Sequence, residues 1–113
     1  MRQLWHPDLD QVTLAGALSA LGDPVRLSMV LTLQDGQEHL RGDFSVDVGP
    51  STLSHHTKTL REAGILRSRE EGTRCYMSLR PEFEHRFPGL LDVVLGQAAA
   101  DRAGSDRRAA PGR

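Results

Sequence analysis

The residues from Ser51 to Ala63 place hydrogen-bonding side chains and a cation at helical spacing. At about 100° per residue, one side of such a helix carries Leu53, Thr57 and Leu60, with His56 at its margin. The opposite side is short and polar, and its members are Ser51, Ser54, His55, Lys58 and Glu62. Small groups allow close approach, donors and acceptors match base edges, and cations match phosphate. The segment therefore predicts a helix that can enter the major groove of DNA, although a polar helix face is more often only solvated.

The residues after this helix predict a basic β-hairpin. Gly64 is typical of the glycine that ends a helix, 65–70 alternates as a strand does, and Glu71-Gly72 signals a turn into a second strand over 74–79. Between Ser51 and Arg80 the chain has six basic and three acidic residues, whereas the whole 113-residue chain carries a net charge of −1. A basic segment in a near-neutral chain is typical of a phosphate-binding surface. A helix followed by a basic hairpin is the order of a winged helix-turn-helix.

Two segments resemble the ArsR/SmtB family of bacterial transcription regulators. The family's recognition helix and wing are similar to STLSHHTKTLREAGIL followed by RSREEGTRCYMSL, and its alanine-leucine helix running into Asp-Pro-x-Arg-Leu is similar to ALSALGDPVRLSMVLTL. With the C-terminal helix, the resemblance covers roughly residues 10–100. It implies a dimeric regulator of transcription that binds an inverted repeat in double-stranded DNA.

The contacts expected with DNA fall into two groups. Side chains near the N-terminal end of the helix should read bases, whereas later cations and the wing should contact phosphate or the minor groove. We expect Arg69 and Arg74 to face each other across the wing turn. The complete set is Ser51, Thr52, Ser54, His55, Lys58, Arg61, Arg69 and Arg74.

The remaining sequence predicts a mainly α fold with a β-hairpin wing, about five helices and two to three short strands. We expect an irregular arm over 1–9 in which the Trp5 ring packs on a helix, a domain over 10–100, and a disordered tail over 101–113 that is rich in Gly, Ala and charge. Asp23-Pro24 predicts a capped helix start. Residues 38–44 have room for only one helical turn, and Pro88 should interrupt the chain before a helix from about 88 to 100.

The last helix carries an apolar stripe that predicts a homodimer. Such a stripe has little left to pack on inside one small chain, and the family pairs this helix with its copy in a second subunit. The expected interface is Leu14, Leu18, Leu90, Leu91, Val94 and Leu95.

The family's known metal sites are incomplete in this chain. No cysteine lies between residues 37 and 50, and residues 95–98 offer no strong ligand to complete a site on the last helix. The single cysteine, Cys75, has no partner for a dithiol switch. Weak candidate ligands remain in His6, His39, Glu84 and His85, which as nitrogen and oxygen donors suit nickel or zinc. No cofactor is assigned with certainty, because surface histidines are usually not ligands.

Other classes of protein fit the sequence less well. There is no Gly-rich phosphate loop, nucleophile motif or paired-carboxylate site, so we do not expect an enzyme. No apolar run is long enough to span a membrane, and the cysteine content suits the cytoplasm. The alternative function is a winged-helix interaction module or co-regulator that acts through a protein partner.

Overall fold

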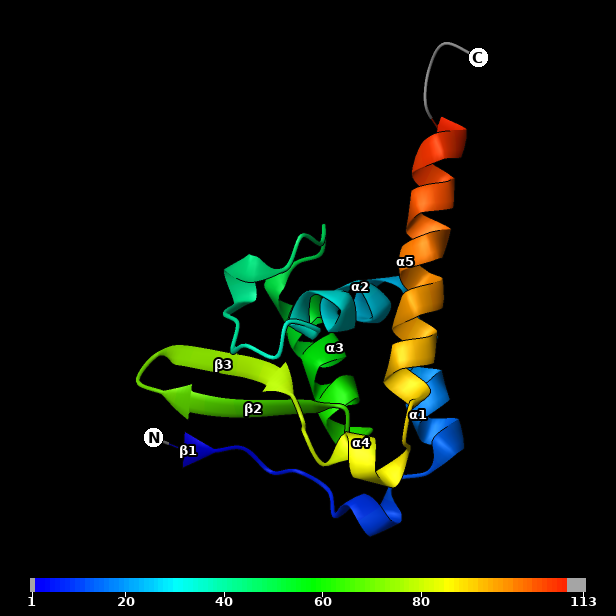
Figure 1. The fold of residues 1–113 in the computed structure, drawn as a ribbon. Helices are drawn as coiled ribbons and strands as arrows, with labels where there is room; N and C mark the ends of the chain where they lie inside the picture. The colour runs from blue at the N-terminus through cyan, green and yellow to red at the C-terminus, as the bar shows by residue number, and fades with distance from the viewer. Residues whose placement is uncertain (1, 110–113) are drawn as a thin grey trace.

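The computed structural model describes the backbone of residues 2–109 and the side chains of residues 4–104. This part of the chain forms α-helices, two single-turn 3-10 helices and a small antiparallel sheet (Figure 1). The predicted winged helix-turn-helix with five helices and two to three strands is confirmed. The helices are α1 (Leu14–Leu21), α2 (Pro24–Leu33), α3 (Pro50–Glu62), α4 (Phe83–Arg86) and α5 (Leu90–Ala109), with the 3-10 turns η1 (Leu9–Gln11) and η2 (Arg41–Asp43).

Helices α1 and α2 begin at side-chain caps. The Thr13 hydroxyl accepts the N–H of Gly16 at 3.0 Å, and the Asp23 carboxylate accepts those of Val25 and Arg26 at 2.9 and 3.1 Å. Pro24 occupies the first turn of α2, where its missing N–H would have no partner inside the helix. The start predicted at Asp23-Pro24 is confirmed.

The sheet has strand order β1-β2-β3, from β1 (Arg2–Gln3), β2 (Leu66–Glu71) and β3 (Arg74–Leu79). The wing turn is closed by Gly72 at φ 61, a conformation that glycine adopts without strain. Arg74 therefore pairs with Glu71, and Arg69 pairs with Tyr76. The prediction that Arg69 and Arg74 face each other was wrong, because the turn starts one residue later than Glu71. The predicted irregular arm also needs correction, since its second and third residues form β1.

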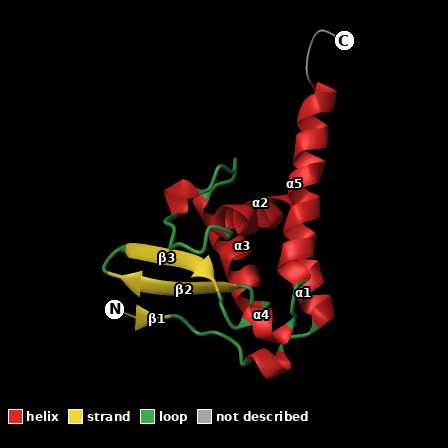
Figure 2. Cartoon of the chain, viewed as in Figure 1, coloured by secondary structure: helices red, strands yellow, loops and turns green. Residues whose placement is uncertain are grey.

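The helices and the hairpin lie in separate parts of the molecule. Figure 2 shows the hairpin projecting from one side of the helices, while α5 stands along the other side and extends beyond the rest. The core lies between them, where α2 contacts α1, α3, β3 and α5. Its largest fully buried side chains include Phe83, Met29, Leu33, Leu60 and Leu95. Phe44 is also buried and anchors the connection before α3.

The C-terminal part breaks where the sequence predicts and ends later than predicted. Pro88 and Gly89 separate α4 from α5, and Gly89 has φ 78. Helix α5 then continues to Ala109 instead of ending near residue 100, so residues 101–109, predicted to be disordered, have a helical backbone. The rest of the predicted tail, 110–113, lies outside the described residues.

None of the described helices alone is long and apolar enough to cross a membrane; α1 and α2 meet the length and composition requirement only as a pair bent by 98°.

Candidate nucleic-acid interface

Helix α3 presents a polar face to solvent and an apolar face to the core, as the sequence predicts. The exposed side chains are Ser51, Thr52, Ser54, His55 and Lys58, and the buried ones are Leu53, His56, Thr57 and Leu60. The N-cap residue before the helix is Gly49, which has no side chain to cap it. The first-turn N–H groups that have no partner inside the helix can therefore bind an anion.

Hydrogen bonds on the buried side fix the rotation of α3. Arg26 Nη1 donates to His56 Nδ1 at 3.0 Å, and Arg26 Nε donates to the carbonyl of Ala20 at 2.7 Å. Because arginine only donates, His56 carries its ring proton on Nε2. One guanidinium thus joins the end of α1, the start of α2 and the back of α3, and this holds the polar face outward.

The end of α3 sets the direction of the wing. Gly64 has φ 79, Ile65 N–H donates to the Leu60 carbonyl, and Gly64 N–H donates to that of Arg61. This is the Schellman arrangement that ends a helix in a left-handed residue. A Cβ at Gly64 would lie 2.9 Å from side-chain atoms of both Leu9 and Val12, so close packing also requires glycine.

A cation that the sequence analysis missed lies at the start of α3. The exposed Arg41 of η2 donates from Nη2 to Ser54 Oγ at 3.0 Å and from Nη1 to the Pro50 carbonyl at 3.4 Å. Arg41 lies outside the basic 51–80 segment, and only the tertiary fold brings it to the predicted base-reading residues. The irregular spacing of residues 37–50 carries no signal for it.

The two wing arginines predicted to contact DNA have different surroundings. Arg74 is exposed and its strand partner is Glu71. Arg69 donates from Nε and Nη2 to the two carboxylate oxygens of Glu38 at 2.6 and 2.8 Å, and its guanidinium lies 4.3 Å from the centre of the Tyr76 ring. This bidentate pair holds the pKa of Glu38 below its usual value. Arg69 therefore joins the wing to the connection that precedes η2.

Arg61 also has a partner within the chain. Its Nε donates to the carbonyl of Trp5 at 3.0 Å, so it holds the N-terminal arm on the end of α3. Arg80 donates to the carbonyl of Pro7 at 2.7 Å, and Arg86 donates to those of Leu9 and Val12. These bonds fix the arm through its backbone. The Trp5 ring, predicted to pack on a helix, is instead 66% exposed.

The four candidate metal ligands lie on three separate segments, because only Glu84 and His85 share an element, α4. His6 has both ring nitrogens engaged, Nδ1 with the Leu4 carbonyl and Nε2 with the N–H of Ser68. His39 contacts two aspartates, and Glu84 accepts the N–H of Gly89 at 2.8 Å. Within the described residues, no group of three or more His, Cys, Asp or Glu side chains is placed to hold a metal ion.

The only cysteine is half-buried in β3. Burial raises the pKa of the Cys75 thiol, and the nearby Glu70 raises it further. A raised pKa disfavours the reactive thiolate.

The predicted dimer residues divide between the core and the surface. Leu91 and Leu95 are 8% and 2% exposed, so they pack inside their own chain instead of being left for a partner. Leu14 and Leu18 of α1 are 48% and 45% exposed, and Val93, which the prediction omitted, is 65% exposed. Leu90 and Val94 lie half-buried at the edge of the core. Because α2 packs on α5, the predicted stripe includes both buried and partly exposed residues, and its role in pairing two subunits stays a prediction.

A shallow groove follows the exposed residues. It has a volume of about 480 Å³ and is lined by Leu14, Phe87, Pro88, Leu90 and Val93, among others. The groove joins the start of α1 to the start of α5. Figure 1 shows α1 and α5 on the side of the helices away from the hairpin, so this mostly apolar groove lies on that side.

The arrangement of a recognition helix, a preceding turn and a wing defines a winged-helix DNA-binding protein. The chain is 36% identical over 89 residues to the uncharacterised HTH-type transcriptional regulator YceK of Bacillus subtilis (strain 168), covering 75% of this chain and 88% of that protein. It therefore belongs to the HTH-type transcriptional regulators. The crystal structure of M. tuberculosis Rv0081 is similar, with a TM-score of 0.56 and 26% identity over 79% of this chain and 92% of that one. No family model matches the sequence.

Proposed function

We propose that the protein is a dimeric transcription regulator of the ArsR type that binds an inverted-repeat operator. Each subunit inserts the N-terminal half of α3 into a major groove, and the two insertions lie about one helical turn apart. Ser51, Thr52, Ser54 and His55 contact base edges, while Lys58 and Arg74 contact phosphate. In this proposal Arg61 and Arg69 act mainly inside the chain, because each donates to a partner of its own.

The observation that carries the proposal is the fixed outward orientation of the polar face of α3. Its exposed hydroxyl and imidazole groups lie on one side of a helix whose other side is buried and bonded to α2 through Arg26 and His56. The resemblance of the sequence to the ArsR/SmtB recognition helix and wing supports the same choice.

The apolar surface on α1 and α5 supports the dimer. Leu14, Leu18 and Val93 are large apolar side chains left exposed in a single chain, and they belong to α1 and α5, which Figure 1 shows away from the wing. Covering this surface with a second copy would place the two α3 helices on the outside of a symmetric dimer. That arrangement suits an operator with two-fold symmetry.

Binding to selected DNA tests the proposal. An operator duplex is obtained by selection from a random library, and fluorescence anisotropy compares it with a scrambled duplex over a salt series. Ser54→Ala and His55→Ala should each weaken operator binding by on the order of 1–3 kcal/mol and leave the affinity for scrambled DNA nearly unchanged. Ser19→Ala, which changes an exposed serine on α1, is the matched control.

Two results would contradict the proposal. If Ser54→Ala and His55→Ala retain the full operator preference, α3 is not the reader. If no duplex is selected and the chain binds DNA only weakly at any salt concentration, the alternative function as an interaction module or co-regulator is favoured.

A further inference from the structure

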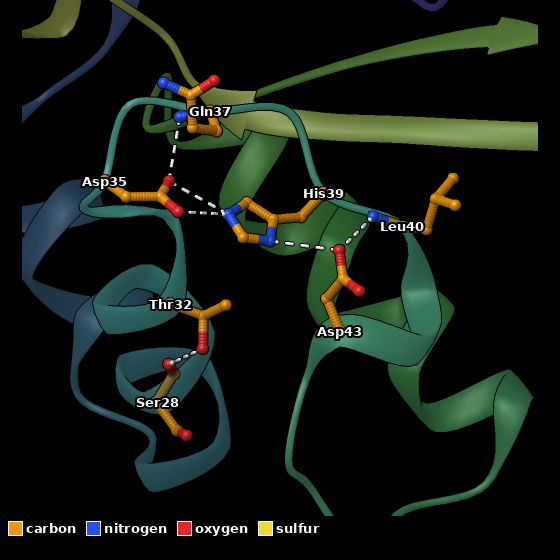
Figure 3. Close-up of polar contacts among 7 residues, drawn as sticks. All are labelled: Ser28, Thr32, Asp35, Gln37, His39, Leu40 and Asp43. Carbon is orange, nitrogen blue, oxygen red and sulfur yellow. Dashed lines mark hydrogen bonds and ion pairs between the residues drawn. The ribbon is translucent and has the colours of Figure 1, made fainter.

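One histidine before α3 lies between two carboxylates on different segments (Figure 3). His39 Nε2 lies 2.9 and 3.0 Å from the two carboxylate oxygens of Asp35, and Nδ1 lies 3.1 Å from Oδ2 of Asp43. Carboxylates only accept hydrogen bonds, so both contacts form only if both ring nitrogens carry protons. The complete arrangement therefore requires a charged imidazolium.

The backbone of His39 is itself held in place. Its N–H donates to the Met77 carbonyl at 2.7 Å, and Met77 N–H donates to the His39 carbonyl at 2.9 Å. This bridge fixes the ring relative to β3, whatever its charge. The ring then determines where Asp43 lies, and the Asp43 carboxylate also accepts the N–H of Leu40 at the start of η2.

The turn that His39 holds carries Arg41. Arg41 donates to the hydroxyl of Ser54, a proposed base-reading residue, and to the carbonyl of Pro50. A serine hydroxyl that accepts from arginine keeps its own proton to donate, which suits an acceptor on a base edge. The remaining N–H groups of the exposed guanidinium can bind a base or a phosphate.

We propose that Arg41 is a specificity-determining residue and that His39 is a positioning residue, whose protonated ring holds η2 so that Arg41 stays on Ser54. The inference rests on the proposed function, since it assigns which side chains set the operator preference. The contact between protonated His39 and Asp43 lies before α3 in the chain. It acts on the proposed base-reading residue Ser54 through Arg41.

The direction of the pH effect follows from the groups around the ring. Asp35, followed by Asp43, raises the pKa of His39 above its usual value, against the effect of partial burial. From β3 the neighbour is Met77, which carries no charge, and the adjacent Glu38 is paired with Arg69. The contact is therefore complete below about pH 6.5, the ordinary histidine value, and is lost as the pH rises through the raised pKa.

The test measures operator preference, the ratio of operator to scrambled-duplex affinity, from pH 6 to pH 8.5 by anisotropy. For the wild type it should fall on the order of fivefold across this range, the lower end of typical coupling between sites. His39→Gln should remove this fall, because a neutral amide cannot bridge both carboxylates. Asp43→Asn should also remove it, because the amide carries no charge to bind the protonated ring. The matched controls are His85→Gln and Asp47→Asn, which change exposed residues and should retain it.

Arg41 variants separate specificity from charge. Arg41→Ala should lower the operator preference roughly tenfold at pH 6, as expected for loss of a base-reading group, and should also remove the fall with pH, because His39 acts through Arg41. Arg41→Lys should keep the affinity for scrambled DNA, because it keeps the charge, and should lose the preference. The pKa of His39, measured by NMR without DNA, should lie above that of His39 in Asp35→Asn.

Each remaining outcome has a distinct meaning. If the wild type prefers its operator and His39→Gln shows the same pH profile, the inference fails and the proposed function stands. An Arg41→Ala variant with unchanged preference would also overturn the inference and leave the proposed function standing. If the wild type selects no duplex, the proposed function fails, and the inference fails with it because no preference exists.

Discussion

The two ends of the molecule leave different kinds of side chain exposed. At the end formed by α3 and the wing, exposed groups are polar, and most nearby arginines are bound to partners within the chain, as Arg26, Arg61 and Arg69 are. At the end formed by α1 and α5, the exposed side chains include two leucines and a valine, which are Leu14, Leu18 and Val93. The end with α3 and the wing suits binding to a polar partner. The end with α1 and α5 suits packing against an apolar surface.

Residue type alone therefore does not decide which side chains of this molecule can contact a partner. At the polar end, an arginine is available to DNA only if its bonds within the chain leave exposed N–H groups, as those of Arg41 do. At the apolar end, a leucine is available to a second subunit only if it lies on the helix face that α2 does not cover. The following experiments compare, at each end, a residue that is held inside the chain with one that is left exposed.

The largest effect is expected within α5. Leu95 is fully buried, so Leu95→Ala should lower the free energy of unfolding by about 2–5 kcal/mol through the lost contacts and the cavity. Leu18→Ala should act only through self-association, and its effect in urea unfolding should disappear on dilution. A Leu18→Ala effect as large as that of Leu95→Ala in dilute protein would place Leu18 in the core and remove the distinction.

A second experiment tests the exposed apolar surface itself. Leu14→Glu combined with Val93→Glu should give a folded monomer, because both side chains are exposed in the single chain and a buried charge would oppose pairing. Analytical ultracentrifugation at micromolar concentration, with circular dichroism for folding, measures the result. By contrast, Leu91→Glu should unfold the chain, since that side chain packs in the core. A folded double mutant that still sediments as a dimer would show that the interface lies elsewhere.

The third experiment compares the two wing arginines. Arg74→Ala should weaken binding to all DNA sequences and lower the salt slope by about one unit per contact. Arg69→Ala should leave the slope nearly unchanged and instead loosen the wing, because it releases Glu38 and uncovers Tyr76. Anisotropy over a salt series and amide hydrogen exchange in β2 and β3 separate the two effects. Equal salt slopes for the two variants would mean that Arg69 leaves Glu38 to bind phosphate.

The sequence was sufficient for the elements that local rules govern. The cap at Asp23-Pro24, the helix end at Gly64 and the two faces of α3 follow from backbone chemistry and apolar spacing within a few residues. The Pro88 interruption follows in the same way. These features depend on neighbours in the chain, so a single sequence predicts them.

Features that depend on distant partners were not predictable. Nothing near Arg41 indicates that it reaches Ser54, and nothing near Arg69 indicates that Glu38 holds it. The spacing of leucines in α5 gave the stripe, but only the position of α2 decides which of them are buried. The His6 ring is a further case, because its partner Ser68 lies 62 residues away.

The smallest predicted effect concerns this histidine, whose behaviour opposes that of His39. His6 Nε2 accepts the N–H of Ser68 at 3.0 Å, a bond that only the neutral ring can make if Nδ1–H donates to Leu4. Burial lowers the pKa of His6, and the backbone bond to Leu4 only partly offsets this. The folded state therefore binds the proton less readily than the unfolded state, so stability from this contact is present above pH 6.5, the ordinary histidine value, and declines as the pH falls below it.

Amide hydrogen exchange measures this effect, because the bond to His6 Nε2 protects the Ser68 amide of β2. After correction for the intrinsic rate, the Ser68 amide should exchange faster at pH 5.5 than at pH 7.5, and the arm should loosen with it. His6→Gln should remove the pH dependence, since its amide oxygen can accept at either pH, while His85→Gln should keep it as the matched control. Protection at Ser68 that stays constant with pH in the wild type would show that the arm is held by Arg61 and Arg80 alone.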